Sequence, residues 1–192
     1  EQFTQHRHQS NNPNSLSNDF VLNIIEDNQG NIWVGTVGGG LSHFNINNEP
    51  FTHYSHQTNG LNSLSHNNVF SILEDSQGDL WVGTQFGGLN YFNSKNKQFT
   101  HYRHQANNVN SLSHDIVSSV IESRHGNIWI GTNKGINHFN TKNKQFTHYL
   151  HQDNNPNSLS SDVVLSMIED SHGNLWVGTY SGINHFNTQT KQ

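Results

Sequence analysis

The chain has no cysteine among its 192 residues. Disulfide bonds and thiolate sites are therefore excluded, whereas any cellular compartment is compatible with the composition. No apolar run approaches the roughly 20 residues that a membrane-spanning helix needs, so we expect no contact between this segment and a membrane. The sequence starts at Glu1 without a signal-peptide pattern, which favours a piece excised from a longer protein or an engineered chain.

Basic residues are also scarce. The chain has nine Lys and Arg and 14 Asp and Glu, which gives a formal net charge of -5. Binding to nucleic acid requires clustered positive charge that neutralises phosphates, so nucleic acid is not an expected partner. Apolar residues make up only 30% of the chain, a composition that approaches that of disordered chains. Only the order of the residues indicates a folded protein.

The chain is built by repetition. A Glu, a turn and the phrase Gly-Asn/Asp-Ile/Leu-Trp-Val/Ile-Gly-Thr recur four times, with a period of about 47 to 48 residues. Such a period, carried by short strands, is typical of the blades of a β-propeller. We therefore predict one all-β domain over residues 1–192, made of four-stranded antiparallel blades. The four repeats span residues 1–48, 49–96, 97–143 and 144–190.

The second repeat shows where the four strands of a blade lie. Alternation and turn residues predict strands at Val69 to Glu74, Leu80 to Thr84, Leu89 to Asn93 and Phe99 to Tyr102, in order from the inner to the outer edge. The segment Asp75-Ser76-Gln77-Gly78 is typical of a tight hairpin between the first two. A long polar connection then leads to the next blade.

The phase of the repeat leaves the last blade one strand short. The chain begins with an outer strand, Glu1 to His8, and ends after a third strand, Gly182 to Asn187. Pairing the N-terminal strand with the last blade, within one chain or between two, would remove two exposed sheet edges. We expect a homodimer that forms one eight-bladed ring by strand exchange, and the alternative is a four-bladed monomer.

Residues Ile72 to Asn90 resemble the two-component regulator propeller repeat, whose pattern is close to v-x-s-i-x-E-D-x-x-G-n-l-W-v-G-T-x-x-G-l-n. The other three copies match nearly as well. The resemblance implies a periplasmic or extracytoplasmic sensor region of a bacterial receptor, commonly a hybrid histidine kinase, whose propellers respond to ligands such as oligosaccharides. The signalling and membrane segments of such receptors are not in this sequence, and rings of that family usually hold about seven or more blades.

Two residue types that recur in every copy are interpreted as structural. The Trp is expected to lie between adjacent blades, where the Gly two residues later permits close backbone approach. The Glu that ends the inner strand is expected to accept a hydrogen bond from a neighbouring turn, and a cation held by a ring of carboxylates is the alternative. These residues are Trp33, Trp81, Trp129, Trp176, Glu26, Glu74, Glu122 and Glu169.

Neither a metal site nor an enzyme is predicted. Histidines three residues apart, such as His53 and His56, recur on the outer strands, where alternation directs the two side chains to opposite faces. We interpret them as solvated polarity that protects an edge, and expect no cofactor. Catalysis needs different residue types gathered once, whereas most Ser, His, Asp and Glu here are repeated. A propeller lyase acting on a small molecule or glycan is the alternative.

Positions that differ among the copies are the candidates for ligand binding. Loops between the second and third strands, and connections from the fourth strand to the next blade, share the face where propellers usually bind ligands. Aromatic rings there can stack on sugars, and neutral drift in exposed loops is the competing interpretation. The candidates are Phe86, Lys134, Tyr180, His66, His114, Asn18 and Ser161. We expect a binding or scaffold module for an oligosaccharide, or an engineered repeat protein that self-assembles.

Overall fold

The structure, a computed structural model, describes residues 2–47, 50–60 and 62–190. Glu1 and the boundary between the first two repeats, residues 48 and 49, lie outside this part of the chain. Blade 1 contains β1 (Val21–Glu26), β2 (Ile32–Thr36), β3 (Leu41–Phe44) and β4 (Phe51–Tyr54). Blade 2 contains β5 (Val69–Glu74), β6 (Leu80–Thr84), β7 (Leu89–Asn93) and β8 (Gln98–Tyr102).

The other two blades follow in the same order. Blade 3 contains β9 (Val117–Glu122), β10 (Ile128–Thr132), β11 (Gly135–Asn140) and β12 (Gln145–Tyr149). Blade 4 contains β13 (Val164–Glu169), β14 (Leu175–Thr179) and β15 (Gly182–Phe186). Each blade is one antiparallel sheet whose strands pair in chain order, which confirms the predicted all-β propeller architecture. None of the described residues belongs to a helix long and apolar enough to cross a bilayer.

The hairpin between the first two strands has the predicted chemistry. In blade 2, Gly78 has a φ of +78° and donates its N–H to the carbonyl oxygen of Asp75 at 2.9 Å. The Asp75 carboxylate accepts from the backbone of Gln77 at 2.9 Å and from Nε1 of Trp81 at 2.8 Å. One aspartate therefore fixes both the turn and the tryptophan that follows it.

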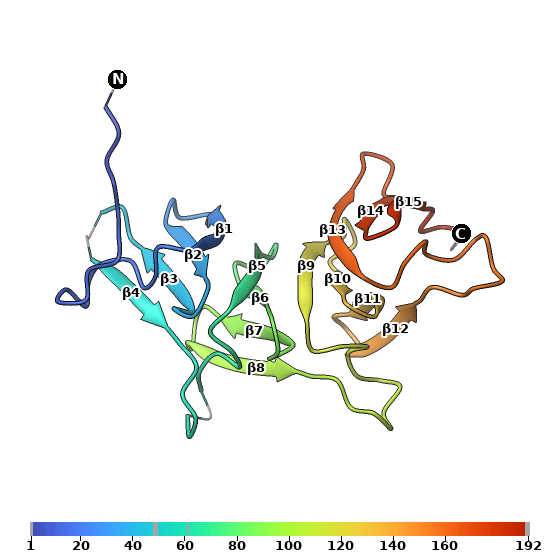
Figure 1. Cartoon of the computed structure of the whole chain (residues 1–192), viewed down its shortest axis with the longest axis horizontal. Helices are drawn as coiled ribbons and strands as arrows, with labels where there is room; N and C mark the ends of the chain where they lie inside the picture. Colours follow the sequence, from blue (N-terminus) through green and yellow to red (C-terminus); the bar gives the residue numbers. More distant parts are fainter. Residues whose placement is uncertain (1, 48–49, 61, 191–192) are drawn as a thin grey trace.

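The four blades stand along an arc, with β1, β5, β9 and β13 on its inner side (Figure 1). The arc is open between blade 1 and blade 4. Residues 2–8 form no strand, and β15 carries no fourth strand. The predicted N-terminal strand therefore does not complete the last blade of its own chain, because it leaves blade 1 at the opposite end of the arc from β15 (Figure 1).

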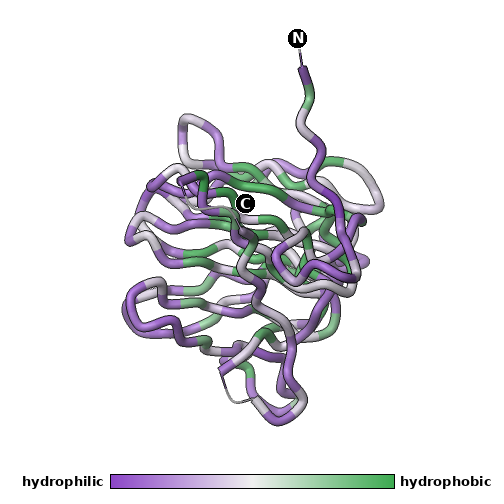
Figure 2. Tube along the Cα trace, turned by 90° about the vertical axis from the view of Figure 1, so that its left-hand side faces the viewer, coloured by the Kyte–Doolittle hydropathy of each residue, from purple (hydrophilic) through white to green (hydrophobic). Residues whose placement is uncertain are grey.

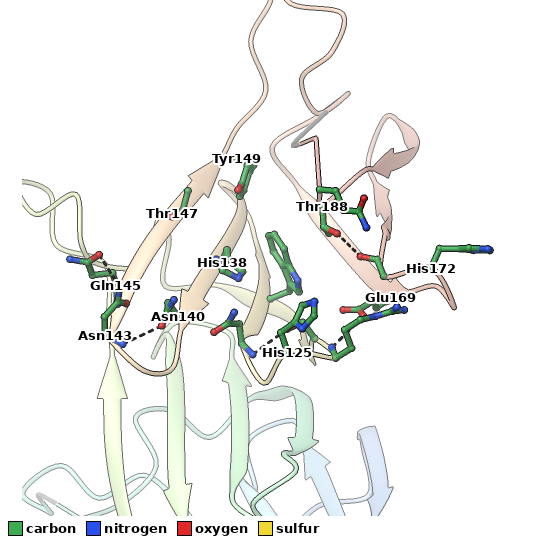
Figure 3. Close-up of a pocket in the computed structure, with 16 residues that line it drawn as sticks. His125, His138, Asn140, Asn143, Gln145, Thr147, Tyr149, Glu169, His172 and Thr188 are labelled. Carbon is green, nitrogen blue, oxygen red and sulfur yellow. Dashed lines mark hydrogen bonds and ion pairs between the residues drawn. The ribbon is translucent and has the colours of Figure 1, made fainter.

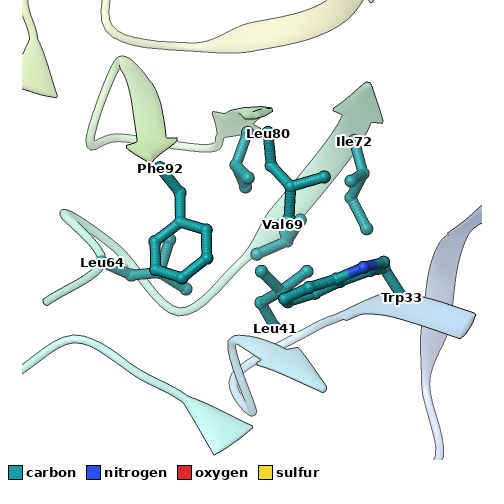
Figure 4. Packing of buried hydrophobic residues seen from close by; sticks show 8 residues of the cluster. Trp33, Leu41, Leu64, Val69, Ile72, Leu80 and Phe92 are labelled. Atoms are coloured by element: carbon teal, nitrogen blue, oxygen red, sulfur yellow. The ribbon is translucent and has the colours of Figure 1, made fainter. Parts of the chain in front are cut away.

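Buried apolar residues gather between blades. At the junction of blades 1 and 2, Trp33 and Leu41 pack against Leu64, Val69 and Phe92 (Figure 4). Equivalent clusters fill the next two junctions. Along the tube of the chain, apolar positions follow the strands, while hydrophilic ones occupy the loops (Figure 2).

The repeated tryptophan occupies the predicted place wherever a blade follows. Trp33, Trp81 and Trp129 are buried, whereas Trp176 in blade 4 is 39% exposed. The difference has a simple cause, because no blade covers the outer face of blade 4 in this chain. The prediction is thus confirmed for three of the residues, and the fourth marks an open end.

The repeated glutamate links each blade to the turn of the preceding one. The Glu74 carboxylate accepts from the backbone N–H of Asn28 at 2.8 Å. Glu122 accepts from the backbone and hydroxyl of Ser76, at 2.8 and 2.7 Å, and Glu169 pairs with Nε of Arg124 at 2.9 Å. The predicted bond to a neighbouring turn is therefore confirmed for these three, while no turn precedes Glu26.

The close approach of blades depends on the glycine of the second strand. A Cβ on Gly83 would lie 2.7 Å from Cγ1 of Val117 in the next blade, and such contacts force side chains and backbone to shift. We expect Gly83→Ala to lower the free energy of unfolding by about 1–3 kcal/mol, measured by urea denaturation.

A double-mutant cycle tests the cause of this loss. Because Val117→Ala removes the methyl group that the new Cβ would strike, Gly83→Ala should cost less in the Val117→Ala background than in the wild type. Strictly additive effects would show that the glycine is required for another reason.

Candidate functional site

The loops at one end of the blades meet as predicted. In blade 2, the N–H of Gln85 in the β6–β7 loop donates to the carbonyl oxygen of Asn68 at 3.0 Å, and Gly88 N–H donates to that of Asp115 at 2.9 Å. Asn68 and Asp115 belong to the connections that enter blades 2 and 3. In blades 1 to 3 the loop between the second and third strands is held between two connections in this way, and in blade 4 it is bonded to the connection that enters the blade. Together these loops and connections form one surface, the loop face.

The second-to-third-strand loops present different side chains on the loop face. Phe86 in blade 2 is 53% exposed and Tyr180 in blade 4 is 74% exposed. Lys134 is exposed at the place of Phe86 in blade 3, and Gly38 takes that place in blade 1. Tyr180 lies one position earlier in its loop, at the place of Gln85. The three larger candidate side chains thus reach solvent from consecutive blades.

The other candidate column has a local structural role. His66 Nδ1 accepts from the N–H of Asn68 at 3.1 Å, and His114 Nδ1 accepts from that of Ile116 at 3.0 Å. Asn18 Oδ1 and Ser161 Oγ accept in the same way from the N–H two residues on, at 2.8 and 3.2 Å. These residue types are interchangeable because each supplies an acceptor that closes the same turn.

His66 combines this capping role with an exposed aromatic neighbour. Burial lowers the pKa of His66, and the nearby His56 and Arg103 lower it further. The imidazole is therefore neutral near pH 7, with its proton on Nε2, because Nδ1 is the acceptor. Its ring meets that of Phe86 edge to face, with centroids 5.5 Å apart.

Arg103 lies beside Phe86 and was not predicted from the sequence as a candidate residue. Its Nη2 donates to the carbonyl oxygen of Phe86 at 2.7 Å and pairs with the Asp115 carboxylate at 3.3 Å. Variation among the copies could have marked this position, because the residue after the outer strand is Ser55 in blade 1, Arg103 in blade 2 and Leu150 in blade 3. Phe86, His66 and Arg103 form what we call the blade 2 cluster.

A hollow lies between blades 3 and 4, away from the blade 2 cluster (Figure 3). It has a volume of about 570 Å³ and is lined by Trp129, Tyr149, His138, Asn140 and Gln145, among others. Its volume falls in the range of small-molecule sites. The sequence analysis did not predict a ligand site at these residues and interpreted Trp129 as structural, although the turn Ser-Arg-His-Gly at residues 123–126 departs from the pattern of the second copy.

The same hollow recurs between blades 2 and 3 with a volume of about 320 Å³, lined by Trp81, Tyr102, Glu122 and Lys144, among others. It therefore arises at two of the junctions between blades. The larger example borders the blade that has no fourth strand. The inter-blade hollows are therefore part of the repeated architecture, whereas the exposed side chains of the loop face differ from blade to blade.

The paired histidines hold the connections in place. His101 Nε2 lies 2.8 Å from the carbonyl oxygen of Ser63, and His104 Nδ1 lies 2.7 Å from that of Leu112. The other outer strands repeat this arrangement. The pairs are thus more than solvated edge polarity, and within the described ranges no three His, Asp or Glu side chains converge as metal ligands.

Comparison with known proteins places the repeat in a family. The model of the two-component regulator propeller matches residues 15–38, 63–86, 111–134 and 158–181, which together make up half of the chain. No curated protein sequence matches the chain.

Solved structures share the fold. The extracellular domain of the putative hybrid two-component system BT4673 from B. thetaiotaomicron superposes with a TM-score of 0.73 and 24% identity, over 90% of this chain and 22% of that one. The corresponding domain of BT3049 gives 0.67 and 24%, over 92% and 30%. An inactive virginiamycin B lyase from Staphylococcus aureus gives 0.63 and 16%, over 97% and 60%. The chain spans under a third of the length of the two receptor domains.

The turn-closing role of His66 can be tested by exchange with its counterpart from blade 1. We expect His66→Ala to lower the free energy of unfolding by about 1 kcal/mol at pH 7, whereas His66→Asn keeps the acceptor, as Asn18 does, and should preserve stability. Urea denaturation of both variants measures the difference, and equal losses would contradict the role.

The pH dependence gives a second readout. Because folding lowers the pKa of His66, the unfolded chain binds more protons, and the contribution of His66 is complete above a pH of about 6.5 and lost as the pH falls. The wild type should therefore lose more stability between pH 7 and pH 5 than His66→Asn does. An equal loss in both proteins would show that His66 does not titrate differently on folding.

Proposed function

This chain belongs to the two-component regulator propeller family, and on that basis we propose that it is a non-catalytic module that binds a polar ligand outside the cytoplasm. Two of the similar structures named above are extracellular domains of putative hybrid two-component systems. We propose the same extracytoplasmic location for this chain, and a ligand bound at its loop face.

One observation carries the proposal: two aromatic rings are exposed in the loops that join the second and third strands of two blades, and the backbone bonds that hold these loops are repeated. The backbone of each loop is held by bonds that recur from blade to blade, as with Gln85 to Asn68 and Tyr180 to Val163. The side chains at these positions are therefore free to differ without a cost to folding. Phe86 and Tyr180 each leave much of a ring open to solvent, which favours contact with a partner molecule.

The blade 2 cluster suggests the chemistry of the ligand. The Phe86 ring offers an apolar surface, the His66 ring stands beside it, and Arg103 supplies a cation whose side chain is 49% exposed. Arg103 is largely neutralised by Asp115, so a strongly anionic ligand is not favoured. An apolar ring face beside hydrogen-bond donors suits a hydroxyl-rich ring, and this supports our proposal of an oligosaccharide as the ligand.

Catalysis has less support from the same contacts. The side chains able to transfer protons, such as Glu122 and His104, are engaged in hydrogen bonds that recur along the arc. Residues that make the same hydrogen bond in several blades stabilise the fold. The lyases share the fold with this chain at 16% identity, and a common fold does not imply a common reaction.

The binding proposal can be tested with a glycan array screened against the purified chain, followed by titration calorimetry of the hits. We expect Phe86→Ala and Tyr180→Ala each to raise the dissociation constant roughly 3- to 10-fold, because a stacked aromatic ring contributes about 0.5–1.5 kcal/mol. Val109→Ala is the matched control, since Val109 is an exposed apolar residue on the long connection into blade 3.

The outcomes separate the ligand class from the site. Binding that survives both aromatic substitutions would move the site away from the loop face. A wild-type chain that binds no glycan on the array would contradict the oligosaccharide assignment.

A further inference from the structure

We propose that the hollow between blades 2 and 3 is a second binding site, and that its ligand is a free α-amino acid with an apolar or aromatic side chain. The hollow has a volume of about 320 Å³, at the lower end of the range for small-molecule sites. Aromatic rings, lysines and carboxylates line it. An α-amino acid carries the complement of each of these groups on a single carbon atom.

The hollow is separate from the loop face and is complete within two neighbouring blades. It is bordered by the β5–β6 hairpin of blade 2 and by the β9–β10 hairpin and the β11–β12 turn of blade 3. The antiparallel order of the strands places these turns at the end of each blade opposite to the β6–β7 loop. Both blades contain all four strands and pack against a blade on each side, so the site does not involve the ends of the arc.

Aromatic rings form one wall of the hollow. The rings of Tyr91 and Tyr102 lie beside that of Trp81, with centroids 4.8 and 5.9 Å away. Phe139 of blade 3 packs against Tyr102 at 4.9 Å. Trp81 and Phe139 are almost completely buried, whereas the two tyrosines are half-buried. The tyrosine rings therefore leave apolar surface open to the hollow, which an apolar or aromatic side chain of a ligand can cover.

Tyr91 is particular to blade 2. At its position, facing the tryptophan of the second strand, the other blades have His43, His138 and His185. Asp79 likewise stands where the other blades have an asparagine. The Tyr91 hydroxyl donates to the Asp79 carboxylate at 2.5 Å. Burial and this hydrogen bond raise the pKa of Tyr91 to about 12, so the phenol stays neutral. Because its polar end is engaged within blade 2, Tyr91 offers a ligand its ring.

Two lysines of the β11–β12 turn, Lys142 and Lys144, border the same hollow. The N–H of Lys144 donates to the carbonyl oxygen of Asn140 at 2.9 Å, which holds the turn. Its Nζ lies 5.7 Å from the centroid of the Phe139 ring, and therefore at the aromatic wall. Among the ion pairs of the described residues, none involves either lysine. Both charges are thus available to the carboxylate of a ligand.

Carboxylates from two other elements supply the opposite charge. The two carboxylate oxygens of Glu122 each accept one hydrogen bond from Ser76, at 2.8 Å from its N–H and 2.7 Å from its hydroxyl. Since a carboxylate oxygen can accept a second bond, Glu122 keeps acceptors for the N–H groups of an ammonium ion. Asp75 also borders the hollow and adds a second negative charge.

The presence of both signs of charge selects a zwitterion. An amine without a carboxylate would be repelled by Lys142 and Lys144, and a carboxylic acid without an amine would be repelled by Glu122 and Asp75. Contacts between like charges weaken binding. In an amino acid each charged group has a partner of opposite sign, and the side chain is left to cover the tyrosine rings.

The larger hollow between blades 3 and 4 has a different set of charges. There Arg124 takes the place of Ser76 and pairs with Glu169 at 2.9 Å. Ser123 takes the place of Asp75. One carboxylate is therefore neutralised and the other is replaced by a hydroxyl, so that hollow is less suited to an ammonium group than the smaller one.

Titration calorimetry of the purified chain with L-phenylalanine at pH 7 tests the site. 2-Phenylethylamine lacks the carboxylate and 3-phenylpropanoate lacks the ammonium group, while both keep the ring. We expect L-phenylalanine to bind, and each analogue to bind at least about tenfold more weakly, because each loses charge-assisted hydrogen bonds. No binding of L-phenylalanine or L-leucine would overturn the proposal. An analogue that binds as tightly as L-phenylalanine would contradict recognition of a zwitterion.

Two substitutions locate the binding. Ser76→Arg introduces the residue that blade 3 has at this position, and its guanidinium should pair with Glu122 as Arg124 does with Glu169, so that the fold is kept. Lys144→Gln removes one of the two cations. Each variant should raise the dissociation constant of L-phenylalanine at least about tenfold, and urea denaturation checks that both remain folded.

Lys95→Gln is the matched control. Lys95 is exposed on the β7–β8 turn of blade 2, at the place that Lys142 takes in blade 3, and it does not line the hollow between blades 2 and 3. Its substitution should leave the dissociation constant unchanged. Unchanged binding in both Ser76→Arg and Lys144→Gln, or an equal loss in the control, would move the site away from this hollow and overturn the proposal.

Discussion

A blade of this protein can bury its apolar faces only against another blade. The twisted four-stranded sheet has no helix to cover it, so the Trp and Leu side chains of one blade must pack on the Val and Phe side chains of the next, as Trp33 does on Val69 and Phe92. Gly35 allows this approach, since a Cβ there would lie 2.6 Å from Cγ1 of Val69. Every other regularity of the chain follows from repeating this one junction.

The junction also explains why the copies differ so little. It is fixed by apolar packing and by side chains that reach from one blade to the backbone of a neighbouring one, such as Glu74 to Asn28 and the Ser71 hydroxyl to Val120. A substitution at any of these positions must suit two blades at once. Loop positions such as Phe86 carry no such double constraint, because backbone atoms make the bonds that hold the loop. Diversity therefore accumulates on the loop face, where a partner molecule can make use of it.

Much of this organisation could be predicted from the sequence, because local patterns encode it. The inner, second and third strands of blade 2 begin and end where alternation places them, and the buried Trp81 and the bonded Glu122 have the expected partners. The capping role of His66 and the position of Arg103 were not predictable, since both depend on backbone atoms that only the folded turns bring close. Ring closure depends on small angles between blades, which no local pattern specifies.

The repeated architecture bears on the kind of ligand that suits the loop face. Phe86, Lys134 and Tyr180 present one exposed side chain from each of three consecutive blades. A ligand with a repeated chemical unit gains from contacts with more than one blade, because the second binding event takes place at a high effective concentration. Oligosaccharides have such units, which is the physical reason for ranking them first among the proposed ligands.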